Sequence, residues 1–170
     1  MSSTFPVPPD VRVARDFRIT RGTDSMFREN KHVDPAVTAL IKQGEWVVFN
    51  GSGDVVKVAG STAADPAQGA VVNWTRFKKG DFADGQADAG GLGEITTVRG
   101  AYEADTKIFD IGGVYNVGDI LVVKDDGAGN GTLFPVTPAA ATVKQLARAV
   151  GKVTAPVADG VLSFASMGAA

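Results

Sequence analysis

The sequence predicts a mainly β protein with a single domain, and three observations support this prediction. The chain has 170 residues, which is enough for one hydrophobic core and short for two. Its 21 glycines indicate many tight turns, and its hydrophobic content of 44% is too high for a disordered chain. Between the turns, short runs of β-branched residues recur, which is typical of antiparallel strands joined by hairpins.

The first 33 residues differ from the rest and predict an extended N-terminal arm, followed by a body over residues 34–170. Prolines at positions 6, 8 and 9 favour an extended start. Over residues 11–21, apolar and polar side chains then alternate as in a β-strand. Basic residues outnumber acidic ones in the arm, whereas acidic residues outnumber basic ones in the body.

Arginines recur at every third position in the arm, which spreads them around an extended strand. Solvated charges are the usual explanation of such a pattern. Arginines also suit acidic grooves, because a guanidinium group pairs with a carboxylate through two hydrogen bonds. We therefore expect the arm either to pair with its own body or to lie along a second protein. The candidate partner-binding residues are Arg12, Val13, Arg15, Phe17, Arg18, Ile19 and Arg21.

One short helix is predicted after the arm, because Asp34, Pro35 and Gly44 suit its N-cap, its first turn and the residue after its end. Residues 139–150 also contain good helix formers, but the strand-like GKVT that follows leads us to predict a strand from about Leu146. The strands predicted in the body are 45–50, 54–59, 70–78, 94–99, 106–111, 119–124, 132–136, 146–154 and 161–166. The last four form the two clearest hairpins.

No motif predicts catalysis or a cofactor, and we expect the protein not to be an enzyme. The chain has no cysteine, and its single histidine, His32, lies among charged residues, where a solvated side chain is the usual role. A net charge of −2 provides no strong basic field for nucleic acid. No window is apolar and long enough for a membrane-spanning helix. We therefore expect neither a nucleic-acid partner nor a membrane partner.

Two segments rich in acidic side chains have some of the residues that a metal site needs. Asp84, Gln86 and Asp88 begin a calcium-loop pattern, but Glu94 is one place short of the closing position, so we expect a surface loop over residues 81–93. The run DDGAGNG at 125–131 suits a turn closed by local hydrogen bonds better than a metal cage. No metal site is therefore predicted.

The aromatic side chains in the predicted strands are expected to fill a β core. The alternative is an exposed platform for carbohydrate binding, which would require several coplanar rings at the surface. The residues concerned are Trp46, Phe49, Trp74, Phe77, Phe109, Phe134 and Phe164.

Three segments carry a family resemblance: GEWVVFNGSGDVVKVAG, GDILVVKDDGAGNGTLFPVT and LARAVGKVTAPVADGVLSFASM. They resemble parts of bacteriophage capsid cement and head-decoration proteins, and the likeness covers residues 40–168. The resemblance implies a single β-barrel or β-tulip-like body, commonly trimeric, on the outside of the expanded shell. It also implies that an extended terminus clamps neighbouring capsid proteins, and it carries no catalytic residue.

From the residues and the resemblance together, we expect a structural virion protein on the outer capsid surface of a tailed phage, assembled in the host cytoplasm. It would bind the major capsid protein and bridge neighbouring copies, as a homo-oligomer with a trimer favoured over a dimer. The alternatives are a carbohydrate- or surface-binding β module, a hydrolase with an unrecognised acid pair, and another virion part such as a tail-tube or head-completion protein. A chain lacking residues 1–21 is expected to fold and to bind the shell more weakly.

Overall fold

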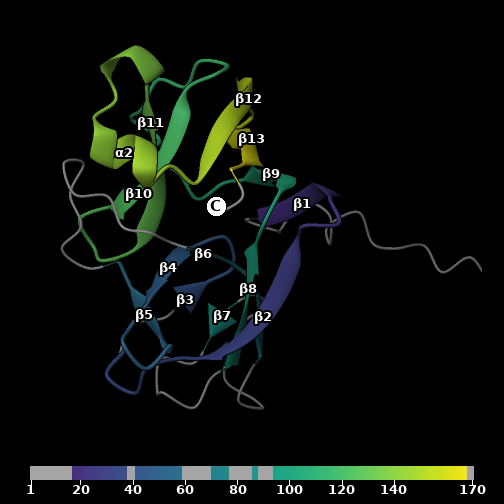
Figure 1. Ribbon diagram of the computed structural model, residues 1–170, viewed down its shortest axis with the longest axis vertical. Coiled ribbons are helices and arrows are strands. Elements are labelled where there is room, and N and C mark those ends of the chain that lie inside the picture. Colours follow the sequence, from purple (N-terminus) through teal and green to yellow (C-terminus); the bar gives the residue numbers. More distant parts are fainter. Residues whose placement is uncertain (1–16, 38–40, 59–69, 77–85, 88–93, 168–170) are drawn as a thin grey trace, which may run out of the picture.

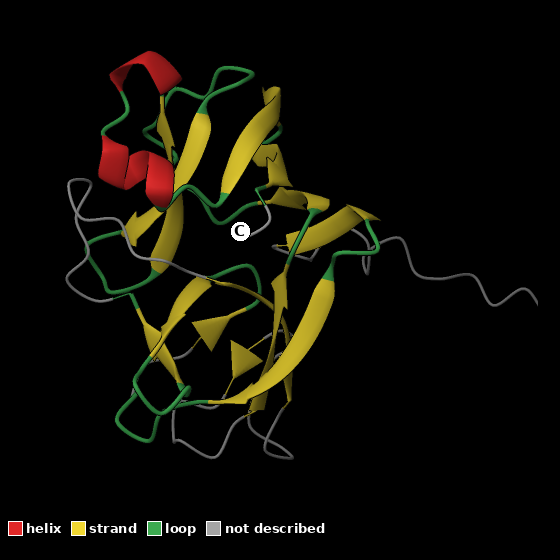
Figure 2. Cartoon of the chain, in the orientation of Figure 1, coloured by secondary structure: helices red, strands yellow, loops and turns green. Residues whose placement is uncertain are grey.

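The computed structural model describes residues 17–37, 41–58, 70–76, 86–87 and 94–167, with the backbone alone described for 70–76, 86–87 and 94. It confirms a mainly β protein with one short α-helix (Figures 1 and 2). The strands are β1 (Phe17–Gly22), β2 (Phe27–His32), β3 (Ile41–Lys42), β4 (Trp46–Phe49), β5 (Val55–Lys57), β6 (Ala70–Arg76), β7 (Gln86–Ala87), β8 (Glu94–Arg99), β9 (Tyr102–Thr106), β10 (Ile120–Asp125), β11 (Gly131–Val136), β12 (Gly151–Ala158) and β13 (Val161–Ser166). The helical elements are the 3-10 turn η1 (Pro138–Ala140) and the helix α2 (Val143–Ala147).

One antiparallel sheet contains all these strands except β3 and β7, which pair with each other. Its order is β1-β9-β13-β12-β10-β11-β4-β6-β8-β2, and β5 pairs with β4 beside this path. In Figure 1, β1, β9 to β13 and α2 form an upper half, and β2 to β8 form a lower half. Within the described residues, the end strands β1 and β2 do not pair with each other, so the sheet is not a closed barrel, one of the two forms that the resemblance implied.

At the two ends of the sheet, β1 follows β9 and β2 follows β8 around a corner. β1 pairs with β9 and β2 pairs with β8, so two bent ribbons run side by side between the two halves (Figure 1). At the corner, Gly100 has a φ of 91°, and a Cβ there would clash with the carbonyl oxygen of Ser25. Glycine alone tolerates both this backbone conformation and so close an approach.

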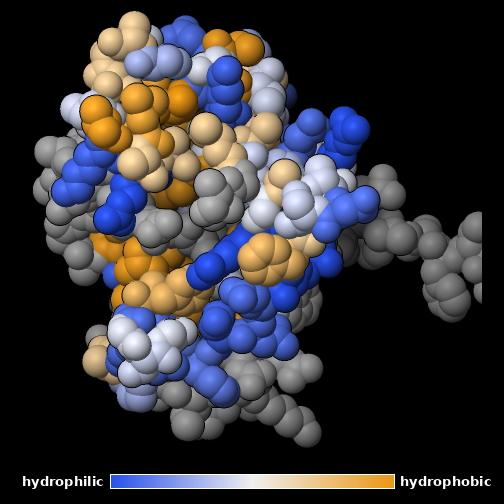
Figure 3. All heavy atoms as spheres, in the orientation of Figure 1, coloured by the Kyte–Doolittle hydropathy of each residue, from blue (hydrophilic) through white to orange (hydrophobic). Residues whose placement is uncertain are grey.

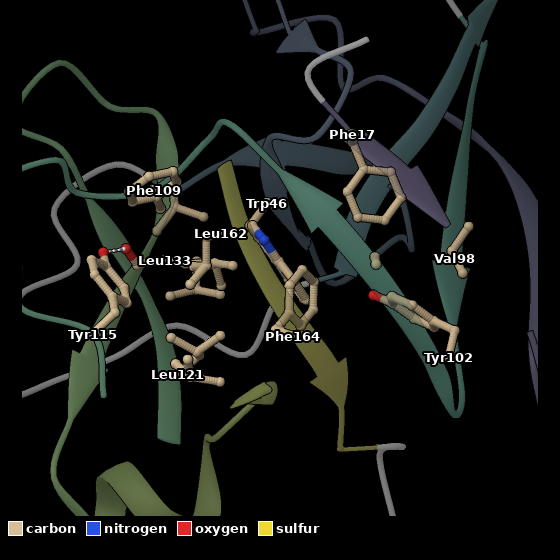
Figure 4. Close-up of a cluster of buried hydrophobic side chains, with 14 residues drawn as sticks. Phe17, Trp46, Val98, Tyr102, Phe109, Tyr115, Leu121, Leu133, Leu162 and Phe164 are labelled. Atoms are coloured by element: carbon tan, nitrogen blue, oxygen red, sulfur yellow. Dashed lines mark hydrogen bonds between the residues drawn. The ribbon is translucent and has the colours of Figure 1, made fainter. Parts of the chain in front are cut away.

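Most of the core belongs to one group of buried side chains, the large cluster, which Figure 4 shows. Aromatic rings join its parts: the ring centroid of Tyr102 lies 6.3 Å from that of Phe17 and 6.2 Å from that of Phe164. The members of the large cluster are Phe17, Trp46, Val58, Val98, Tyr102, Ala104, Phe109, Tyr115, Leu121, Val123, Leu133, Val153, Leu162 and Phe164. The core role predicted for Trp46, Phe109 and Phe164 is confirmed, whereas Phe49 and Phe134 are only partly buried. The side chains of Trp74 and Phe77 lie outside the described residues.

A small cluster fills the lower half and includes part of the segment predicted to be a helix. That helix prediction is wrong for the residues described. The Oδ1 atom of Asp34 accepts the N–H of Ala36 (2.7 Å) in a turn, and Ile41–Lys42 form β3. Gly44, with a φ of 85°, lies in a second turn, and such turns need left-handed backbone just as helix ends do. The small cluster consists of Val33, Val37, Ile41, Val47, Val55 and Ile95.

The strands predicted near β4, β5, β6, β8, β10, β11 and β13 are confirmed, as are the hairpins β10–β11 and β12–β13. The strand predicted over 106–111 is wrong, because the sheet position is taken by β9, whose sequence YEADT has low strand propensity. The strand predicted from Leu146 is also wrong. Thr142 and Gln145 form a capping box that starts α2, and β12 begins only at Gly151.

Candidate binding surface

The described part of the predicted arm belongs to the sheet. β1 pairs with β9 of the same chain, so this part of the arm pairs with its own body. Phe17 is 1% exposed in the large cluster, so its side chain is not available to a second protein, and Ile19 is partly buried against the same cluster. Arg12, Val13 and Arg15 lie outside the described residues.

Arg18 and Arg21 remain exposed on β1 and face acidic residues of β9. The Nη2 atom of Arg18 lies 3.1 Å from Oδ2 of Asp105, and Nη1 of Arg21 lies 3.9 Å from Oε1 of Glu103. The arginine side chains are 60% and 75% exposed, and ion pairs at such positions contribute about 0.2–1 kcal/mol. These two arginines are therefore the described members of the candidate set that a second protein can reach.

A pair of truncations tests whether β1 belongs to the body. A chain in which a start methionine directly precedes Arg18 would lack Phe17. A chain in which the start methionine directly precedes Phe17 would keep it. We expect the shorter chain to be less stable than the longer one by about 3–5 kcal/mol, because Phe17 fills the large cluster. Urea unfolding followed by circular dichroism measures the difference, and equal stabilities would contradict this placement of β1.

Exposed large apolar side chains gather in the upper half of the molecule. Figure 3 shows hydrophobic residues near α2 and hydrophilic residues along β2. With the single exception of Phe27, the exposed large apolar side chains of the described residues follow residue 110 in the sequence. They are Ile111, Val114, Val117, Val143, Leu146, Val157 and Met167. Where exposed apolar side chains lie close together, they commonly mark a site where another protein binds.

The loop between β9 and β10 displays three of these side chains, which we call the apolar tip. Ile111 is 90% exposed, Val114 is 76% exposed and Val117 is 62% exposed. A loop normally presents polar side chains to water, so three aliphatic side chains so fully exposed in one loop stand out. The apolar tip is the strongest described candidate for a protein contact.

Buried contacts hold the base of this loop in place. The hydroxyl of Tyr115 shares its single proton between the carbonyl oxygens of Asp110 (2.9 Å) and Leu133 (3.0 Å), and Figure 4 shows the second contact. Its ring meets that of Phe109 edge to face, with centroids 5.3 Å apart. Burial, together with the nearby charge of Asp110, raises the pKa of Tyr115, so the hydroxyl stays a donor at neutral pH. These contacts of Tyr115 therefore fix the position of the loop that carries the apolar tip.

The acidic run at 125–131 forms the turn that its sequence predicted. Oδ1 of Asp125 accepts the N–H groups of Gly127 (2.8 Å) and Gly129 (2.6 Å). Across the described residues, no three His, Asp or Glu side chains gather as metal ligands would. Asp84 and Asp88, from the other acidic segment, lie outside the part of the chain that the structure describes.

One buried ionic group has no counterpart in the sequence predictions. Glu45 is 2% exposed, and its Oε1 atom lies 3.0 Å from Nζ of Lys57. Burial raises the pKa of Glu45, and this effect outweighs the backbone N–H of Lys42 and the charge of Lys57, which lower it. Nζ of Lys57 also donates to Oδ1 of Asn130 (2.6 Å). The sequence gives no local signal that Lys57 is buried beside two polar side chains, because Glu45 and Asn130 are distant from it along the chain.

Helices in the described part of the chain are all too short or too polar to cross a membrane. Comparison with known proteins found no matching family model, no matching curated protein and no matching solved structure. The fold and surface therefore define the chain as a mainly β protein with an apolar tip.

Proposed function

We propose that this chain is a structural virion protein that binds the outside of a tailed-phage capsid and stabilises the shell by bridging neighbouring major capsid proteins. The apolar tip of Ile111, Val114 and Val117 is the observation that supports this proposal most. Covering such a side chain completely is favourable by roughly 1.5–3 kcal/mol. The resemblance of residues 40–168 to capsid cement proteins supports a capsid protein as the partner.

Bridging needs at least two contact sites on each copy. The apolar tip is one, and the exposed Arg18 and Arg21 of β1 suit acidic groups on a neighbouring subunit. On a repeating shell, the second contact forms at high effective concentration once the first is made. Oligomerisation of the chain, with a trimer favoured over a dimer, multiplies these contacts further.

A triple substitution in the apolar tip tests the proposal. We expect Ile111→Ser, Val114→Ser and Val117→Ser together to weaken binding to expanded, undecorated shells of the same phage by at least about 100-fold. This corresponds to a loss of about 3 kcal/mol, or about 1 kcal/mol for each side chain, which is less than the value for complete covering. The side chains concerned are 62% to 90% exposed, so the fold should be unaffected. Co-sedimentation of the purified variant with the shells gives the occupancy.

The matched control is Phe27→Ser, which removes an exposed apolar side chain from the lower half. This variant should bind the shell as the unchanged protein does. If the triple variant occupied shells as fully as the control, the apolar tip would not be the capsid contact. If the unchanged protein failed to bind any expanded shell, the function itself would be refuted.

A tail-tube or head-completion protein would use the same apolar tip against other copies of itself. Electron microscopy of the mixture separates these roles, because a decoration protein appears as discrete copies on the shell and a tube or completion protein appears as rings. A carbohydrate-binding platform has less support. Of the described candidate rings, Trp46, Phe109 and Phe164 are buried in the large cluster, and Phe49 and Phe134 are partly buried.

A further inference from the structure

Three polar side chains from distant parts of the sequence meet where the two halves of the sheet join. Nζ of Lys57 lies 3.0 Å from Oε1 of Glu45 and 2.6 Å from Oδ1 of Asn130. The side chains of Lys57 and Glu45 are only 10% and 3% exposed. The amine and the carboxylate are thus largely closed to water, and the partly buried carboxamide of Asn130 lies beside them.

Strand pairing brings Lys57 and Asn130 together. One edge of β4 pairs with β6. On the other edge, Val47 pairs with Lys57 of β5, and the preceding residue, Trp46, pairs with Gly131 of β11. Hence β5 and β11 follow one another along the same edge of β4. A Cβ at Gly131 would clash with the carbonyl oxygen of Trp46, so the chain must approach β4 closely just after Asn130.

Hydrogen bonds also orient the carboxamide of Asn130. Its Oδ1 atom faces Lys57, while its Nδ2 atom donates to Oδ2 of Asp126 (2.9 Å). Although partial burial raises the pKa of Asp126, hydrogen bonds from Asn130 and Ala128 lower it by more, so this carboxylate stays charged. The amine of Lys57 therefore faces the carbonyl oxygen of the Asn130 side chain, and the amide nitrogen of Asn130 faces the carboxylate of Asp126.

Glu45 is placed to carry a proton. Its Oε1 atom is buried, and no hydrogen bond of good geometry to it is found within the described residues, although the Lys57 amine is next to it. Burial raises the pKa of Glu45, which makes this carboxylate easier to protonate than an exposed one. Transfer of a proton from Lys57 to Glu45 converts the ion pair into a neutral amine and a neutral acid, and a neutral amine is a nucleophile.

We propose that Lys57 and Asn130 form an intramolecular isopeptide bond, with Glu45 as the proton carrier. The lone pair of Nζ attacks Cγ of Asn130, a bond between Nζ and Cγ forms, and the bond between Cγ and Nδ2 breaks. Of the three protons of the lysine ammonium, one stays on the new amide and two leave with the NH2 group of Asn130 as an ammonium ion. Glu45 is regenerated, the charge is conserved, and no oxidant or reductant is needed.

The bond would join β5 in the lower half to the residue that directly precedes β11 in the upper half. It closes a loop between residues 73 positions apart, which restricts the unfolded chain and raises the midpoint of thermal unfolding. This inference does not rest on the proposed capsid function, because it concerns the isolated chain. Failure of shell binding and failure of cross-linking are therefore separate results.

Intact-mass measurement of the purified, denatured full-length protein tests the inference. The mass should be lower than the mass of the sequence by one ammonia molecule, and protease digestion should release a branched peptide that joins Lys57 to Asn130. Lys57→Arg and Asn130→Ala should each restore the full sequence mass. Lys152→Arg, a change at an exposed lysine of β12, is the matched control and should retain the loss of ammonia.

A competing reaction also releases ammonia, because Asn130 is followed by Gly131 and can close a succinimide ring onto the backbone nitrogen of that glycine. The succinimide persists in Lys57→Arg and yields no branched peptide. A full sequence mass in the unchanged protein, or a loss of ammonia that persists in Lys57→Arg, overturns the inference. Glutamine is nearly equal to glutamate in shape, so Glu45→Gln should give the circular dichroism spectrum of the folded protein and should not form the cross-link. If a folded Glu45→Gln variant forms the cross-link as fast as the unchanged protein, the role of Glu45 is overturned.

Discussion

Replacing Phe164 with alanine is expected to lower the free energy of unfolding by about 3–5 kcal/mol. Phe164 is fully buried, and its ring centroid lies 6.4 Å from that of Trp46 and 6.2 Å from that of Tyr102. Neighbouring β12 cannot move in to fill the space without disturbing its pairing with β13. Urea unfolding followed by tryptophan fluorescence measures the loss, and Trp46 reports directly on the cavity.

Phe27→Ala is the control for this substitution. Phe27 lies on β2 and is 48% exposed, so its truncation should cost less than about 1 kcal/mol. The contrast compares the same chemical change at a buried and at an exposed site. Equal losses for the two variants would show that Phe164 does not occupy the centre of the core.

Replacing Gly100 with alanine is expected to lower the free energy of unfolding by about 2–5 kcal/mol. Left-handed backbone costs a non-glycine residue about 1–2 kcal/mol, and Gly100 has a φ of 91°. A Cβ at this position also clashes with the backbone of Ser25, and relieving such overlap costs about 1–3 kcal/mol more. Thermal unfolding measured by calorimetry gives the combined loss.

Gly53→Ala separates these two contributions. Gly53 has a similar φ of 86°, but a Cβ there meets nothing within 4 Å. The variant should therefore lose only the backbone contribution of about 1–2 kcal/mol. If Gly100→Ala were no more destabilising than Gly53→Ala, the close packing of the β1–β2 connection against the corner would be disproved.

Local patterns in the C-terminal half predicted its hairpins well. The strands around DDGAGNG and around the turn at Asp159–Gly160 carry their own β-branched runs, and their turn residues close short connections. The predicted helix after Asp34 failed because Asp, Pro and Gly start and end turns as readily as they start and end helices. A real helix was missed at Val143–Ala147, although Thr142 and Gln145 have the spacing of a capping box.

The candidate surface was predicted less well than the fold. The sequence analysis chose the arginine-bearing arm, of which Arg18 and Arg21 are exposed and Phe17 is core. It placed Ile111 at the end of the strand predicted over 106–111 and attached no role to Val114 and Val117. Apolar residues between two strands are ordinarily expected to be buried, and their exposure follows from the way Tyr115 anchors the loop to Leu133.

By itself, the sequence determined the mainly β class, the absence of disulfide bonds and the positions of most strands, because alternation and turn formation act between residues close along the chain. Only the tertiary structure decided that the sheet stays open, that Phe17 belongs to the core, and that β5 and β11 share one edge of β4. Lys57 and Asn130 meet for this last reason alone. Pairing between strands so distant in sequence depends on how the whole core packs, and a residue's immediate neighbours carry no signal of it.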